Sequence, residues 1–352
     1  MFPLLIRRII PGHLKVHGIS LFCTFFISSI LPLSAQESKL LNDKPGTFKL
    51  ANYGVYDQTN CGFTKGETSA NTQKLLALTD AIRKNPVLNN PRGFDGKADK
   101  TNWKCDPKNG YGIPSEICIQ FCSWSLEKGK EVCWSGEPPY WTLNINRLRT
   151  LGAAGFNETT DEPSHPRAGF NMEQWEKAAE KVNELFYPPG KKEILEPGLD
   201  RYNGIFMVVY NPERPPYWLP VTIRETFALL YDYWRKHPVQ ETSETMVRML
   251  DKEYATFSGP ELDGYAYFGD SNSIFRIGTN STQLPVMRVN PAYWNRGLPR
   301  SAIQFLTFDC PSDKKMIREE KEERLKNNNG YYHLSRFIET LDCHMLVPLI
   351  DR

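Results

Sequence analysis

Cysteines offer the most specific chemistry in this sequence of 352 residues. Four of the eight are spaced as Cys105-x12-Cys118-x3-Cys122-x10-Cys133. Thiols in this arrangement can form disulfides, stay as buried thiols or bind a tetrahedral zinc ion. Structural zinc sites usually combine two close cysteine pairs, and only Cys118 and Cys122 form one here. We therefore predict at least one disulfide among the four, no metal site and no other cofactor.

Two more cysteines, Cys310 and Cys343, lie near the C-terminus. We expect them either to bridge each other or to be buried, and we count both as disulfide candidates. Cys343 precedes His344, which raises the question of a nucleophilic dyad. Adjacent residues on a helix point about 100° apart, so the dipeptide by itself does not form one.

A short aromatic motif occurs twice, as Pro138-Pro139-Tyr140-Trp141 and as Pro215-Pro216-Tyr217-Trp218. The proline pairs stiffen an extended backbone and hold the rings that follow in place. Exposed rings of this kind form flat platforms for sugar rings or peptides, whereas buried ones anchor loops to the core. The binding candidates are therefore Tyr140, Trp141, Tyr217 and Trp218.

Familiar catalytic motifs are missing from the sequence: it has no Gly-x-Ser-x-Gly, no His-Glu-x-x-His, no phosphate-binding glycine loop and no dinucleotide fingerprint. A hydrolase of this sequence would depend on paired carboxylates, as glycosidases do. Asp263 and Asp270 flank Tyr265 and Tyr267 in a stretch of loops and short strands. These two aspartates are the catalytic candidates.

The N-terminal segment has the layout of a secretory signal peptide. Arg7, Arg8 and Lys15 precede an apolar run that ends in Leu33-Ser34-Ala35. We predict that residues 1–35 are a signal peptide cleaved after Ala35, with an ending that resembles export signals of Gram-negative bacteria. The alternative is an uncleaved membrane anchor, although a spanning helix needs about 20 apolar residues. We expect a secreted or periplasmic protein that meets the membrane only if this segment stays.

Charge and composition exclude several classes of protein. The chain carries 43 Lys and Arg against 41 Asp and Glu. Loss of residues 1–35 would remove three basic residues and no acidic one, which lowers the 43 to 40 against the same 41. No basic field therefore favours a nucleic-acid partner. With 40% hydrophobic residues the chain can bury one large core or two smaller ones and is not disordered.

A cysteine-bearing hairpin is predicted in the N-terminal half. Apolar residues at 117, 119 and 121 alternate with polar residues and cysteines, which is the period of a strand. The polar residues 127–131 form a turn, after which a second strand begins. Cys118 and Cys122 would share one face of the hairpin, with Cys133 across the turn.

Helix signals are clearest in the C-terminal half. Asn171 followed by Gln174, and Thr222 followed by Glu225, predict two capped helix starts. Behind Thr222, five residues make one apolar stripe: Ile223, Phe227, Leu230, Tyr231 and Trp234. Further helices are expected at 72–84, 242–257, 314–326 and 334–345, and strands at 204–210, 265–268, 274–277, 286–289 and 302–308.

The elements do not alternate as βαβ units, so we predict an α+β fold. It would contain a small mixed or antiparallel sheet packed by several amphipathic helices. A linker at 155–169 would separate a Cys-containing region, 36–155, from an α+β domain, 170–352. The leading hypothesis for function is an exported, non-catalytic binding module for an envelope protein or a glycan, and the alternative is a secreted hydrolase acting on glycans.

Overall fold

No helix among the described residues of the computed structural model is both long and apolar enough to cross a membrane. The predicted signal peptide and the predicted charged helix at 314–326 lie outside the described residues. The structure describes residues 39–54, 61–102, 111–133, 138–148, 166–269, 275, 277–312 and 330–352, and the backbone of 154–155.

A ten-stranded mixed sheet forms the centre of the described structure. Eight strands follow one another in the order β2-β3-β4-β6-β16-β11-β10-β9, and β1 and β5 each pair with β4. β2 and β3 are parallel, whereas their neighbours along the path pair antiparallel. The strands are β1 (Lys39–Leu40), β2 (Phe48–Ala51), β3 (Phe94–Asn102), β4 (Ser115–Glu127), β5 (Lys130–Cys133), β6 (Tyr140–Ile145), β9 (Lys192–Glu196), β10 (Leu199–Tyr202), β11 (Phe206–Tyr210) and β16 (Phe305–Asp309).

The α+β class is confirmed, but the sheet is much larger than the small one predicted. It is large because strands far apart in the chain join it. β16 pairs with β6 on one side and with β11 on the other. Strands that precede and strands that follow residues 155–169 in the sequence therefore belong to the same sheet.

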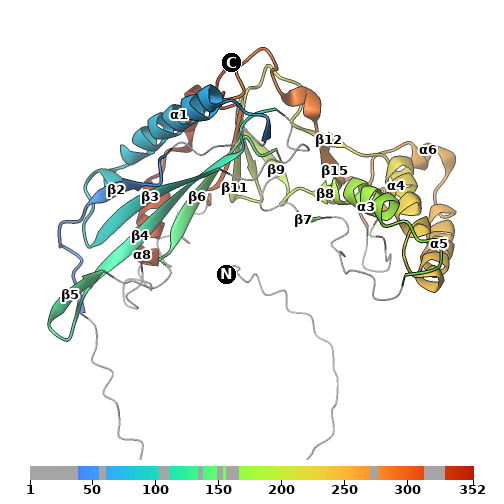
Figure 1. Ribbon diagram of the computed structural model, residues 1–352, viewed down its shortest axis with the longest axis horizontal. Coiled ribbons are helices and arrows are strands. Elements are labelled where there is room, and N and C mark those ends of the chain that lie inside the picture. The colour runs from blue at the N-terminus through green and yellow to red at the C-terminus, as the bar shows by residue number, and fades with distance from the viewer. Residues whose placement is uncertain are drawn as a thin grey trace, which may run out of the picture. The chain divides into compact units, whose positions relative to one another are not determined.

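Helices cover one face of the main sheet, which we call its inner face (Figure 1). They are α1 (Lys65–Arg83), α2 (Pro86–Asn89), α8 (Tyr331–Thr340) and the 3-10 helix η4 (Cys343–Leu349). Their apolar residues share one core with alternate residues of the strands, among them Ile117, Phe121 and Leu143. The start of α1 differs from the prediction. It begins at Lys65 rather than at residue 72 and is capped by Thr64 in a full capping box with Glu67, so Thr72 is buried within the helix.

A smaller sheet packs on part of the opposite, outer face of the main sheet. Its strands run in the order β12-β15-β8-β7. Side chains from it and from the 3-10 helix η3 (Pro291–Tyr293) share a core with outer-face residues of β10, β11 and β16. The bounds of the strands are β7 (Ala154–Gly155), β8 (Phe186–Tyr187), β12 (Trp218–Pro220) and β15 (Met287–Val289).

A helical region has a hydrophobic core of its own. It contains α3 (Met172–Asn183), α4 (Ile223–Arg235), α5 (Gln240–Tyr254), α6 (Gly259–Leu262) and the short strands β13 (Tyr267–Phe268) and β14 (Ile277–Gly278). Both predicted caps are confirmed: Asn171 accepts from the Gln174 amide, and Thr222 accepts from the Glu225 amide. The Glu225 side chain pairs with Arg288, so its role differs from that of its backbone amide, which is capped by Thr222.

The predicted stripe on α4 is confirmed in its main members. Ile223, Phe227 and Leu230 are buried, but Tyr231 and Trp234 are only partly buried. Tyr233 takes the remaining inward position. The inward face of the helix is therefore slightly rotated from the predicted one, and the helix contacts both α3 and α5.

The predicted hairpin is confirmed as β4 and β5. Lys128 and Gly129 form its turn, both with positive φ, and Glu127 pairs with Lys130 on either side. Cys122 and Cys133 form a disulfide across the two strands. The N-terminal half therefore carries the predicted bridge.

Candidate binding face

The two aromatic motifs lie mostly inside the protein. Trp141, Tyr217 and Trp218 are 2%, 4% and 4% exposed, whereas Tyr140 is 53% exposed. The Trp141 indole nitrogen donates to the Asp309 carbonyl at 2.9 Å, so even its polar end is occupied. The period of a strand explains the split in β6, since Tyr140 and Trp141 point to opposite faces. Of the four predicted binding residues, only Tyr140 offers a ring to a ligand.

Tyr217 is held in a buried polar network around Asp200. Its hydroxyl donates to Asp200 Oδ2 at 2.5 Å and lies 2.8 Å from the hydroxyl of Tyr202. Tyr210 donates to Asp200 Oδ1 at 3.2 Å, and Lys192 pairs with Oδ2 at 2.6 Å. Burial, followed by the charges of Tyr202 and Asp200, raises the pKa of Tyr217 far above its usual range. The network gives the Asp200 carboxylate three donors and keeps the tyrosine protonated, which is a structural arrangement.

Of the two predicted catalytic aspartates, the structure describes Asp263. Asp263 is largely exposed beside α6, and Arg224 Nε donates to its Oδ1 at 2.7 Å. This hydrogen bond lowers the pKa of Asp263, so the group stays ionised and does not have the raised pKa of a general acid. Asp270 lies outside the described residues.

The cysteines are placed on both faces of the main sheet. Besides Cys122 and Cys133, Cys61 is disulfide-bonded. The disulfide occupies two of the four sulfurs that a zinc site at 105–133 would need. Cys118 is a half-buried thiol on β4, and burial, then Glu116 and Asp99, raise its pKa to about 12, so it is a poor nucleophile. Cys105 lies outside the described residues.

The outer face of β2, β3, β4 and β6 is polar and at least partly exposed. No described cluster of buried apolar residues covers it, in contrast to the outer face of β10, β11 and β16. We call it the outer polar face. It is defined by Lys49 on β2, Asp95, Lys97 and Asp99 on β3, Glu116, Cys118 and Gln120 on β4, and Tyr140 and Thr142 on β6.

One row of side chains crosses this face from edge to interior. The strand register places Lys49 opposite Lys97, Lys97 opposite Gln120, and Gln120 opposite Tyr140. Partners in register share a face, and neighbouring strands lie about 4.8 Å apart, so the row extends for roughly 14 Å. It presents two ammonium groups, one amide and one exposed ring along a line.

A hollow of about 390 Å³ lies beside the row. Lys49, Lys97 and Gln120 line it, and so does the Cys122–Cys133 pair, which fixes the position of β5 against β4. The volume falls within the range of small-ligand sites. The row and the hollow together form the most site-like surface among the described residues.

The charges on this face are largely balanced locally. Lys97 pairs with Asp99 at 2.7 Å, and Asp99 also accepts from the Asn52 amide. Asp95 accepts from the backbone amide of Thr47 at 2.7 Å. A ligand would therefore meet hydrogen-bonding groups rather than a strong field of one sign.

Sequence reasoning missed Lys97 and Gln120. The signal was present, since residues 94–100 and 115–121 both alternate between inward and outward positions. What the sequence lacks is the register, which sets these two side chains side by side and next to Tyr140.

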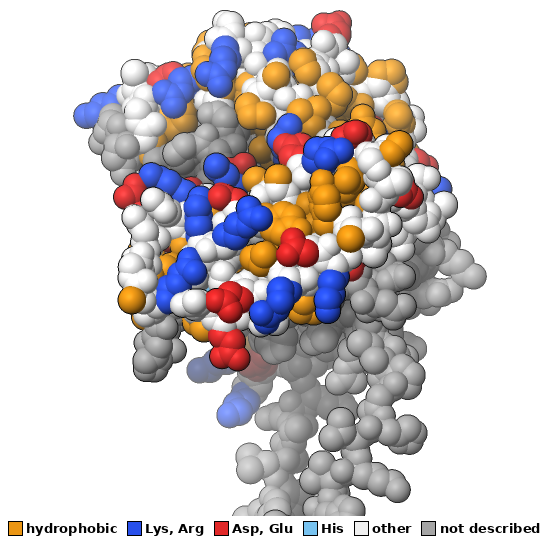
Figure 2. Space-filling model, turned by 90° about the vertical axis from the view of Figure 1, so that its right-hand side faces the viewer, with side chains coloured by type: hydrophobic (Ala, Val, Ile, Leu, Met, Phe, Trp, Pro, Cys, Tyr) orange, Lys and Arg blue, Asp and Glu red, His pale blue; other side chains and the backbone are white. Residues whose placement is uncertain are grey.

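A second surface lies on the helical region. Figure 2 shows hydrophobic side chains gathered in the middle of the face with Lys, Arg, Asp and Glu around them. Partly buried aromatic residues of this region include Tyr231, Trp234, Tyr254 and Phe257. Tyr231 and Tyr254 pack against the Phe227 ring, and the Arg235 guanidinium lies over the Tyr231 ring at 4.8 Å from its centroid.

Comparisons with known proteins found no match. No protein-family model matches the sequence, no curated protein does, and no solved structure resembles this fold at a significant level.

Proposed function

We propose that this chain is an exported, non-catalytic binding protein whose outer polar face takes an uncharged glycan. The observation that supports the proposal best is the row Lys49, Lys97, Gln120 and Tyr140. It combines one exposed ring with two ammonium groups and one amide, all of which can form hydrogen bonds, on a sheet.

The chemistry of a sugar matches this combination. One side of a sugar ring carries mostly C–H groups and packs on the flat face of an aromatic ring such as Tyr140. Its hydroxyls accept from ammonium and amide groups and donate to amide oxygens, as Lys97 and Gln120 provide. The extended row suits several linked sugar units better than a single small molecule.

Local charge balance favours an uncharged glycan. A polyanion would be expected on a face with unpaired lysines, but Lys97 already pairs with Asp99. Asp95 adds a second carboxylate on the same strand. A polycation would in turn meet Lys49 and Lys97.

Export is the second part of the proposal. It rests on the signal-like residues 1–35 and on the Cys122–Cys133 bridge, since disulfides persist mainly in oxidising compartments. In such a compartment the face would be available to extracellular or envelope polysaccharides.

The experiment is a binding titration of the mature protein against soluble starch, xylan, a β-glucan and, as the charged comparator, polygalacturonate. Tyr140→Ala and Tyr265→Ala are a matched pair, because both tyrosines are 53% exposed and only Tyr140 lies on the outer polar face. We expect Tyr140→Ala to weaken binding of an uncharged glycan roughly tenfold, which corresponds to about 1.4 kcal/mol. Tyr265→Ala should leave it unchanged, and Gln120→Ala should weaken it less than Tyr140→Ala does.

Equal affinities of the two tyrosine variants, or binding of polygalacturonate alone, would contradict the proposal. Release of reducing ends from any of these glycans would instead support the hydrolase alternative. Asp263→Asn would then be the first variant to assay.

A further inference from the structure

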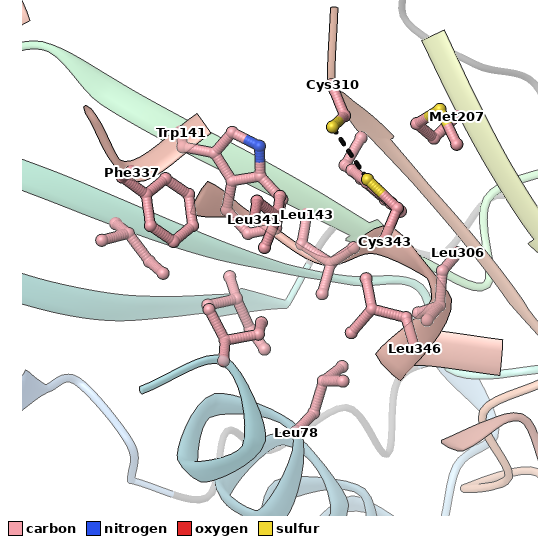
Figure 3. Close-up of a cluster of buried hydrophobic side chains, with 14 of the residues drawn as sticks. Leu78, Trp141, Leu143, Met207, Leu306, Cys310, Phe337, Leu341, Cys343 and Leu346 are labelled. Atoms are coloured by element: carbon pink, nitrogen blue, oxygen red, sulfur yellow. Dashed lines mark hydrogen bonds between the residues drawn. The ribbon is translucent and has the colours of Figure 1, made fainter. Parts of the chain in front are cut away.

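Two cysteines from distant parts of the chain meet in the main core. Cys310 follows β16 directly, and Cys343 is the first residue of η4. They are 5% and 9% exposed and belong to the core on the inner face of the sheet. Figure 3 shows the two sulfurs directed at each other among leucine side chains, and Cys343 Sγ lies 2.8 Å from Cys310 Sγ.

We propose that Cys310 and Cys343 are joined by a further disulfide in the exported protein. Their side chains already approach each other, so bond formation needs only a small adjustment of the two sulfurs. The chain carries disulfides at Cys122 and Cys133 and at Cys61, so the same compartment would oxidise this pair as well.

The reaction is a thiol–disulfide exchange with the disulfide of an exported thiol oxidase. The thiolate of one cysteine attacks a sulfur of that disulfide and forms a mixed disulfide, while the oxidase releases one thiolate. The thiolate of the other cysteine then attacks this chain's sulfur in the mixed disulfide and releases the second oxidase thiolate. Two protons leave the cysteines, two electrons reduce the oxidase to its dithiol, and one S–S bond forms.

Burial determines when this reaction takes place. An oxidase does not reach sulfurs enclosed by Leu306, Leu341 and Leu346 in the finished core. The exchange therefore belongs to the stage at which η4 first packs against β16. Once closed, the bond is protected from external reductants by the same side chains.

The bond would link the C-terminal layer to the sheet. Cys310 and Cys343 are 33 residues apart, and the segment between them includes α8. Phe337 of α8 packs against Trp141 and Phe121, with ring centroids 5.3 Å and 5.6 Å apart. A covalent bond next to these contacts would hold α8 and η4 on the inner face.

Peptide mapping of the exported protein tests the pairing. The protein is purified from the periplasm of an expression host, denatured without reductant in N-ethylmaleimide, and digested. We expect a peptide pair linked through Cys310 and Cys343, and an alkylated Cys118 as the internal control thiol. Alkylation of both Cys310 and Cys343, or a bond from either to another cysteine, would overturn the proposal.

Limited proteolysis tests the effect of the bond. The double variant Cys310→Ala/Cys343→Ala is compared with Cys118→Ala, each purified from the periplasm. We expect faster cleavage within residues 311–342 in the double variant and wild-type rates in Cys118→Ala. Unchanged cleavage in a folded double variant would overturn the proposed role as a link. The mapping on the unsubstituted protein decides the pairing even if the double variant does not fold.

Discussion

The main sheet and the helical region are built on different ranges of contact. In the sheet, β6 pairs with β16 across more than 150 residues of sequence, and α1 and α8 come from opposite ends of the chain to share one core. In the helical region, α4 contacts α3, α5 and α6, which are its nearest neighbours in sequence. The cysteines follow the same division, since none occurs between residues 134 and 309.

This difference concerns the entropy of closing loops. Long-range pairing must overcome the entropy of closing large loops before any contact forms, and the Cys122–Cys133 disulfide, between residues 11 apart, closes only the hairpin loop. Local helix packing needs much less closure. The helical region relies instead on side-chain caps at Asn171 and Thr222 and on clustered aromatic rings. The candidate binding face lies on the region with long-range contacts, on a rigid sheet.

The largest expected effect comes from removing a ring in either core. Phe227 packs against Tyr254 at 5.2 Å, Phe337 packs against Trp141 at 5.3 Å, and both are fully buried. We expect Phe227→Ala and Phe337→Ala each to cost about 3–5 kcal/mol in free energy of unfolding, through lost transfer energy and a cavity. Denaturant unfolding measures the cost.

Hydrogen exchange on the same two variants sharpens the comparison. Phe227→Ala should lower amide protection mainly in α3, α4 and α5, because their contacts are local. Phe337→Ala should lower it in α8, β4 and β6 together. Equal loss throughout the molecule in both variants would show that the two regions unfold as one.

The next effect is a pH dependence specific to the sheet region. His333 is buried against Phe94, with ring centroids 4.5 Å apart, and burial followed by the charge of Arg336 lowers its pKa from 6.5 to about 3. The folded state therefore disfavours the protonated ring. Its contribution to stability is intact above pH 6.5 and is lost as the pH falls toward 3.

This loss should approach about 1.4 kcal/mol per pH unit, or roughly 3 kcal/mol at pH 4.5. His333→Phe should remove this part of the pH dependence, as measured by the denaturation midpoint between pH 7 and pH 4.5. His237, at the end of α4, is the comparison in the helical region and should contribute less because it is partly exposed. The same slope in His333→Phe as in the unsubstituted protein would contradict the prediction.

A smaller effect is expected where the two sheets meet. Tyr217→Phe keeps the ring in its aromatic cluster but removes the hydroxyl between Asp200 and Tyr202. We expect a cost of about 1–3 kcal/mol, because a buried carboxylate loses one of its donors. Tyr210→Phe removes a longer bond from a more exposed ring and should cost less. Thermal unfolding of both variants gives the order.

The smallest effect concerns a single helix cap. Thr222→Ala removes the acceptor for the Glu225 amide and should cost about 1 kcal/mol. Arg224→Ala is the control in the same turn: its ion pair with Asp263 is exposed, and we expect no measurable change in melting temperature. A control variant that destabilises α4 more than Thr222→Ala would show that surface pairing, rather than the cap, stabilises this helix.

Local elements were largely predictable from the sequence. The β4–β5 hairpin, the caps at Asn171 and Thr222, and the buried stripe of α4 depend on residues within a few positions of one another. The start of α1 was missed although Thr64 and Glu67 carry the same capping signal. Gly66 and the run of small polar residues after it weaken the helical pattern there.

The arrangement of the candidate site could not be predicted in this way. Sequence alone determined the class of the fold, the hairpin that carries Cys122 and Cys133, and the aromatic motifs. It did not determine that Trp141, Tyr217 and Trp218 are buried while Tyr140 is exposed. Only the tertiary structure decided this, because one face of β6 lies under α8 and the Tyr217 ring lies between two sheets. The same holds for the row through Lys97 and Gln120, since strand register is a long-range property that a one-residue shift would reverse.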